Sequence, residues 1–92
     1  MYKIFNNQSY NYNLNNDFNK VANDIMGEFS AVIQYGEHAD ETNNMITKNT
    51  WDSIKHEEMV HIGELLALLY KINPMFKTQV EKGMTEFQEK NN

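Results

Sequence analysis

Two stretches of this chain carry apolar residues at the three- and four-residue spacing of an α-helix, and only a short polar link separates them. The first stripe, within residues 17–42, is Phe18, Val21, Ala22, Ile25, Phe29, Val32 and Ala39. The second, within residues 45–72, is Trp51, Ile54, Leu65, Leu68 and Ile72. This spacing places each set on one helix face. Because the link is short, the two helices should run antiparallel as a hairpin.

The ends of the expected helices are marked by capping residues. Asn44 is the expected N-cap of the helix over 45–72. Asn73-Pro74 should end that helix, because the residue before a proline is disfavoured in the α conformation. Proline suits the first position of a helix, so a third and weaker helix is predicted over about 74–89. The predicted fold class is all-α, an antiparallel two-helix hairpin plus a short C-terminal helix.

The segment before the hairpin differs from the rest of the chain. Residues 1–16 are rich in Asn and Tyr and show no helical period, so they are predicted to form a flexible arm. Asp17 is the expected N-cap of the first helix. The predicted organisation is therefore an arm over 1–16 and one helical domain over 17–90.

Composition narrows the class of function. The chain has 92 residues and no cysteine, which limits it to one small domain and excludes zinc–thiolate and iron–sulfur sites. Its net charge of −5 argues against nucleic acid and anionic membranes as partners. No apolar run approaches the roughly 20 residues of a membrane span, and residues 1–16 lack the apolar segment of a signal peptide. We therefore expect a cytoplasmic protein.

Two ionisable residues, Glu58 and His61, interrupt the apolar stripe of the second helix. Glu-x-x-His places both side chains on the same helix face, about one turn apart. A core rarely accepts such groups unpaired, and a metal ion is one partner that satisfies them. The alternative is an exposed helix face, since short matches of this kind arise by chance. Glu37, His38 and Glu41, near the turn, are predicted to lie on a solvated face.

Glu28 should lie at the same height as Glu58 in the hairpin. With residue 43 as the centre of the turn, both lie fifteen residues away, or about 22 Å at 1.5 Å per residue. Two carboxylates in an apolar seam repel each other, and a divalent cation removes that conflict. Carboxylate and imidazole ligands suit iron or manganese, and also zinc.

One hairpin supplies only half of a two-metal site. A four-helix bundle with two metals uses a Glu from each of two helices and a Glu-x-x-His from each of the other two. Two copies related by a two-fold axis would provide that set from Glu28, Glu58 and His61, which predicts a homodimer. Tyr35 follows on the Glu28 face. It is either a core tyrosine or a neighbour of the site that donates a hydrogen bond or takes part in redox chemistry.

These residues also resemble a known family. Glu28-Phe-Ser-Ala-Val-Ile-Gln-Tyr35 followed by Ile54-Lys-His-Glu-Glu58-Met-Val-His61 looks like half of a rubrerythrin-type ferritin-like domain, which reads Glu-x6-Tyr and then Glu-x-x-His. The helix lengths and the short third helix are more similar to encapsulated ferritins, half-size proteins with a di-iron site at a dimer interface. The resemblance covers about residues 17–80.

The resemblance implies that Glu28, Glu58 and His61 are iron ligands in a ferritin-like four-helix bundle, with Tyr35 beside the catalytic site. It implies two Fe ions per dimer, for which Mn or Zn could substitute. It also implies a homodimer within a larger ring such as a decamer. The remaining implied partner is an encapsulin-type shell protein, whose nanocompartment would then enclose the chain.

Three functions fit these residues. The first is a ferroxidase that oxidises Fe(II) to Fe(III) for iron storage or detoxification, with Glu58 of each chain bridging the two metals. The second is a rubrerythrin-like peroxide reductase, which needs an external electron donor because the chain has no cysteine. The third is a non-enzymatic helical dimerisation module, in which Glu28, Glu58 and His61 are polar residues that set the helix register.

Overall fold

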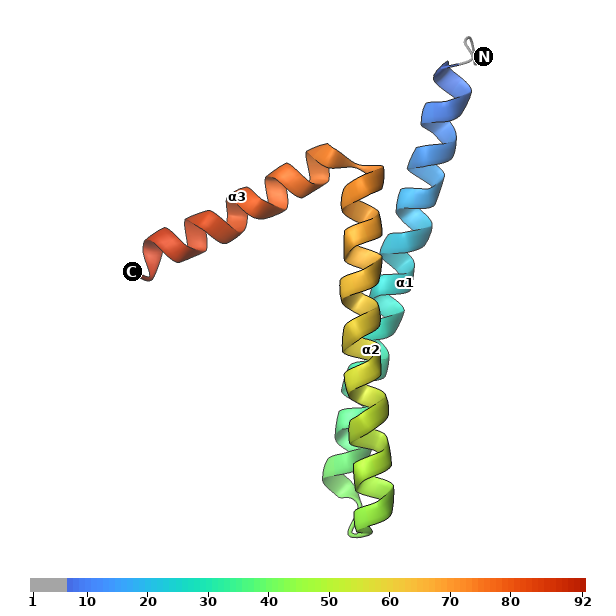
Figure 1. Ribbon diagram of the computed structural model, residues 1–92, viewed down its shortest axis with the longest axis vertical. Helices are drawn as coiled ribbons and strands as arrows, with labels where there is room; N and C mark the ends of the chain where they lie inside the picture. Colours follow the sequence, from blue (N-terminus) through green and yellow to red (C-terminus); the bar gives the residue numbers. More distant parts are fainter. Residues whose placement is uncertain (1–6) are drawn as a thin grey trace.

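The computed structural model consists of three α-helices joined by very short links (Figure 1). It describes the backbone of residues 7–92 and the side chains of residues 16–92. Helix α1 spans Asn7–Glu41, α2 spans Met45–Ile72 and α3 spans Pro74–Lys90. No strand occurs within residues 7–92, so the all-α class is confirmed.

The start of α1 differs from the prediction. The helix begins at Asn7 instead of near Asp17, so residues 7–16 are helical where an arm was expected. Residues 1–6, the rest of that expected arm, lie outside the described residues. The physical reason is helix propagation, because each residue added to an existing turn gains a backbone hydrogen bond without needing an apolar stripe. The lack of an apolar period before Asp17 therefore did not show where α1 begins.

Asparagine side chains define the starts of α2 and α3. Asn44 Oδ1 accepts a hydrogen bond from the Thr47 N–H at 2.9 Å, and Asn73 Oδ1 accepts one from the Phe76 N–H at 3.0 Å. The Asn73 N–H also donates to the Leu69 carbonyl at 2.9 Å and closes α2. Each cap satisfies backbone groups that the helix itself leaves unpaired. Both junctions are therefore set by local interactions.

Removing the first cap should destabilise the hairpin. Asn44→Ala loses the acceptor for the Thr47 N–H, which costs about 1 kcal/mol of unfolding free energy. Asn43→Ala is the matched control, because Asn43 is the exposed neighbour in the same link. Thermal unfolding followed by circular dichroism should show a lower Tm for Asn44→Ala only. Equal Tm values for the two variants would contradict the capping role.

Helices α1 and α2 form the expected antiparallel hairpin, and α1 packs against α2 along most of its length (Figure 1). Lys48 Nζ of α2 donates to the Ala39 carbonyl at 3.0 Å. This contact places a cation at the C-terminal end of α1, where the helix dipole favours positive charge. Ala39, Val21 and Leu69 are the buried apolar residues among the described side chains.

The chain is much more extended than a compact domain, and few of its apolar residues are buried. The radius of gyration is 18.4 Å, whereas a compact domain of this length has about 12 Å. Most described apolar side chains remain half-buried or exposed, Met26 and Phe29 among them. Large exposed apolar patches are typical of binding sites for proteins, membranes or ligands. The second copy that a four-helix bundle requires remains a prediction.

Helix α3 diverges from the hairpin after its first turn. Phe76 packs against Phe18 of α1 and Tyr70 of α2, with ring centroids 5.4 and 6.1 Å apart. Every residue from 81 to 92 is exposed. Figure 1 shows α3 leaving the end of α2 and pointing away from the hairpin. The aromatic contact at Phe76 is thus the root from which α3 projects.

Candidate metal centre

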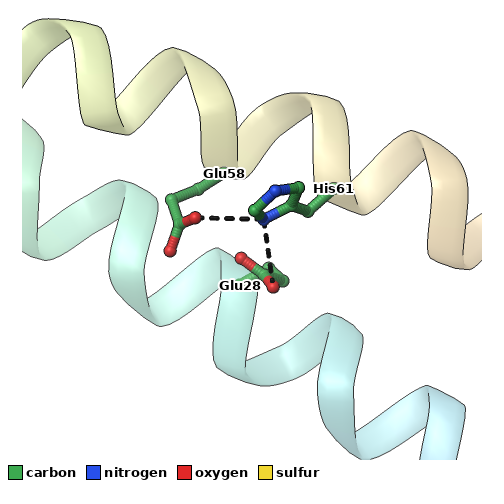
Figure 2. Close-up of side chains that lie close together, drawn as sticks. All are labelled: Glu28, Glu58 and His61. Carbon is green, nitrogen blue, oxygen red and sulfur yellow. Dashed lines mark ion pairs between the residues drawn. The ribbon is translucent and has the colours of Figure 1, made fainter.

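Glu28, Glu58 and His61 meet at the seam between α1 and α2 (Figure 2). Each residue offers one ligand atom, and these atoms all lie within 4.8 Å of one another. His61 Nδ1 lies 3.1 Å from Glu58 Oε1 and 3.5 Å from Glu28 Oε2. The three residues that the sequence placed at one height are therefore together in space.

The helices position these side chains by their spacing. Glu58 and His61 are three residues apart on α2, so both extend toward the same gap between the helices. Glu28 reaches that gap from α1, as Figure 2 shows. All three stand on helical backbone, which holds a ligand set more rigidly than a loop does.

The group lies at the edge of the hairpin. The side chains of Glu28 and Glu58 are 23% and 21% exposed, whereas that of His61 is 48% exposed. Glu28 Oε1 is nevertheless buried and has no hydrogen-bond partner among the described residues. An unpartnered buried oxygen costs about 1–3 kcal/mol. A cation or a hydrogen-bond donor bound to Glu28 Oε1 would remove that cost.

The donor set fits a divalent metal. Carboxylate oxygens and an imidazole nitrogen are ligands that iron, manganese and zinc accept. Atoms bound about 2.1 Å from a common ion lie roughly 3.0–3.4 Å apart. The two distances from His61 Nδ1, 3.1 and 3.5 Å, are close to that range. One chain supplies too few ligands to close such a site, so positions remain for ligands from elsewhere.

Tyr35 lies in a different group of side chains. It is seven residues beyond Glu28, or about 10 Å along the helix, and its ring meets His38 edge-on with centroids 6.4 Å apart. His38 in turn packs on Trp51, with centroids 4.9 Å apart. No described contact joins Tyr35 to the three candidate ligands within residues 16–92. Its role beside the site stays a prediction.

The prediction that His38 lies on a solvated face is wrong. Its side chain is half-buried between Tyr35 and Trp51, and its Nδ1 is buried without a hydrogen-bond partner among the described residues. The flanking residues Glu37 and Glu41 are exposed, as predicted. The sequence signal for His38 was its position three residues after Tyr35, which places the two on one helix face.

The chain matches no protein-family model, no curated protein and no solved structure. Across the described helices, no segment is both long enough and apolar enough to span a membrane. Glu28, Glu58 and His61 are therefore the residues whose chemistry indicates a function.

Proposed function

We propose that this protein is a ferroxidase, with Fe(II) as its substrate and a site completed by a second copy of the chain. The observation that carries the proposal is the group of Glu28, Glu58 and His61, in which a buried carboxylate oxygen has no hydrogen-bond partner among residues 16–92. Two carboxylates and one imidazole attract a divalent cation, and their negative charge favours Fe(III) over Fe(II). The ligands thereby lower the potential at which bound iron is oxidised.

The second copy is required because one chain holds half of the ligand set. His61 is about half exposed on the open side of the seam, and exposed Leu68 lies two turns further along the same side of α2. Covering this side with a second copy around a two-fold axis would bring in a second Glu28, Glu58 and His61. It would also remove Leu68 from water. The result is the ligand count of a two-metal four-helix bundle.

The chemistry needs two iron ions because oxygen accepts electrons most readily in pairs. Each Fe(II) loses one electron to become Fe(III). Two electrons and two protons convert O₂ to H₂O₂, or convert H₂O₂ to two molecules of water. The role of the protein is to hold the ions together and to set their potential. A pair of hairpins encloses no storage volume, so Fe(III) would pass to another protein such as an encapsulin-type shell.

Iron binding provides the direct test. Calorimetric titration with Fe(II) under anaerobic conditions should saturate at one ion per chain, which corresponds to two per dimer. Exposure of the loaded protein to O₂ should then produce the near-ultraviolet absorption of Fe(III) faster than in buffer alone. Failure to bind Fe(II) would refute the ferroxidase and the peroxide reductase together. Binding followed by faster reaction with peroxide under reductant would favour the reductase.

The distances at His61 also support a second function, a metal-free dimerisation module. A protonated His61 between Glu28 and Glu58 would form ion pairs at the observed 3.5 and 3.1 Å. Polar residues that a second copy would bury in this way can set the register of a helical dimer. This function predicts an unchanged dimer in chelator and no bound metal after purification without chelator. Metal analysis of that preparation separates it from the ferroxidase.

A further inference from the structure

Three rings form a continuous row near the turn of the hairpin. We use the name ring row for Tyr35, His38 and Trp51. The His38 ring meets Tyr35 edge-on with centroids 6.4 Å apart, and it packs on Trp51 with centroids 4.9 Å apart. All three side chains are half-buried. The ring row therefore links two oxidisable groups, a phenol and an indole, through one imidazole.

The ring row lies next to the candidate metal ligands along the hairpin. Tyr35 is seven residues after Glu28 on α1, and Trp51 is seven residues before Glu58 on α2. Each is thus about 10 Å from a ligand along the helix axis. Side chains on a helix lean toward its N-terminus. Tyr35 therefore leans toward Glu28, whereas Trp51 leans toward the turn, so Tyr35 is the end of the row nearer to the metal group.

His38 has an unused nitrogen inside the ring row. Its Nδ1 is buried and has no hydrogen-bond partner among residues 16–92. A neutral imidazole carries one N–H, and its other nitrogen accepts a proton. With the N–H at Nε2, His38 therefore offers Nδ1 as a proton acceptor. Tyr35 needs such an acceptor when it is oxidised, because a phenol that has lost an electron becomes a strong acid.

Few other side chains of this protein give up single electrons readily. The chain has no cysteine, and Trp51 is its one tryptophan. Tyr70 packs against Phe76 at the start of α3 and so belongs to a separate group of rings. It is nine residues after His61 on α2, or about 14 Å along the helix axis. Of the two tyrosines with described side chains, Tyr35 is therefore the nearer to the metal group.

We propose that Tyr35 supplies one electron to the iron site when only one Fe(II) ion is bound, and that Trp51 then restores Tyr35 through His38. This proposal rests on the proposed ferroxidase function. Reduction of H₂O₂ to two molecules of water takes two electrons, and a single Fe(II) ion supplies one. Without a second electron, the products are Fe(III), hydroxide and a hydroxyl radical. The ring row thus prevents release of that radical from a half-loaded site.

Oxidation of Tyr35 balances the reaction of one Fe(II) ion with H₂O₂. Fe(II) and Tyr35 each give one electron, the O–O bond breaks, and two protons from solvent complete two molecules of water. The phenol proton of Tyr35 moves to His38 Nδ1, which leaves a phenoxyl radical. Trp51 then gives an electron to that radical while His38 returns the proton, so Tyr35 becomes a phenol again. A one-electron donor in solution, such as ascorbate, reduces the oxidised Trp51.

Electron transfer within the ring row is measurable without iron. In pulse radiolysis, the azide radical oxidises tryptophan in preference to tyrosine, and the two amino-acid radicals absorb at different wavelengths. The Trp51 radical should decay as a tyrosine radical appears, which is the Tyr35–Trp51 step in reverse. Tyr35→Phe should prolong the Trp51 radical several-fold, whereas Tyr70→Phe, the matched control, should leave its lifetime unchanged. Equal lifetimes in the two variants would overturn the proposal.

A His38→Phe variant separates proton transfer from packing. It keeps a ring between Tyr35 and Trp51 but removes the proton acceptor. Transfer between these two residues should slow several-fold in the same radiolysis experiment, and circular dichroism checks that the variant remains helical. A helical variant with an unchanged transfer rate would show that His38 Nδ1 takes no proton, which would overturn its role.

A spin trap for hydroxyl radicals tests the supply of the electron to iron. Protein loaded anaerobically with one Fe(II) ion per two chains would be mixed with an equal amount of H₂O₂. Tyr35→Phe should release several-fold more trapped radical than the unmodified chain, and Tyr70→Phe should match the unmodified chain. Equal yields from all three proteins, with Fe(II) binding intact, would overturn only the role of Tyr35. Absence of Fe(II) binding in the unmodified chain would instead overturn the ferroxidase function itself.

Discussion

Glu58→Ala is expected to abolish Fe(II) binding and to lower the rate of aerobic iron oxidation by more than about 100-fold. Loss of a partner that merely orients a metal ligand already costs 10–100-fold in metal affinity or activity, and Glu58 is placed to be a ligand itself. The substitution would also remove a carboxylate from His61 Nδ1, 3.1 Å away. Stopped-flow absorbance of Fe(III) formation measures the rate, and anaerobic calorimetry measures the binding.

The adjacent residue offers a matched control for this experiment. Glu57→Ala removes the same charge one position away on α2, but Glu57 is exposed and lies outside the metal group. It should bind and oxidise iron at the rate of the unmodified chain. If Glu58→Ala oxidised iron as fast as Glu57→Ala, the assignment of Glu58 as a ligand would be wrong.

Withdrawal of metal is expected to weaken the association through the ligand-bearing face by about four orders of magnitude. An ion present at 100 times its dissociation constant stabilises the form that binds it by about 2.7 kcal/mol. Two ions shared between two copies contribute about 5 kcal/mol, and each 1.4 kcal/mol is about tenfold in the dissociation constant. Mn(II) suits the measurement because it occupies such ligands without rapid oxidation by air.

Sedimentation velocity should report a dimer in Mn(II) and a monomer in chelator. A Leu68→Glu variant should be a monomer in both, because Leu68 is exposed and lies on the face that the second copy would cover. The same mass with and without metal would show that the ions do not join the two copies.

Local sequence signals were sufficient to predict the bounds of α2 and the position of the turn before it. Asn44 caps one end through the Thr47 N–H, and Asn73 with Pro74 closes the other. Both act within four residues, so reading neighbouring residues was enough to place Met45–Ile72. The start of α1 was not predicted. Helix propagation does not require an apolar face, and the apolar face was the signal used.

The position of Glu28 beside Glu58 also followed from the sequence, by counting residues from a short turn. That count works because the rise per residue in a helix is constant, and because two helices joined by a short link usually pack as an antiparallel hairpin. It could not show that Glu28 Oε1 is buried with no partner in the described part of the chain, or that His38 packs against Trp51. Those facts depend on how the two helices are rotated about their axes, which is decided by packing.

The sequence by itself therefore determined three helices, a hairpin and the height at which two carboxylates and an imidazole lie. Only the tertiary structure decided that the His61 side chain is 48% exposed, that Phe29 is left exposed, and that Phe76 of α3 packs against Phe18 of α1. The physical reason is that the spacing of residues along a helix is a local property. The exposure of a side chain, in contrast, depends on which parts of the other helices pack against it.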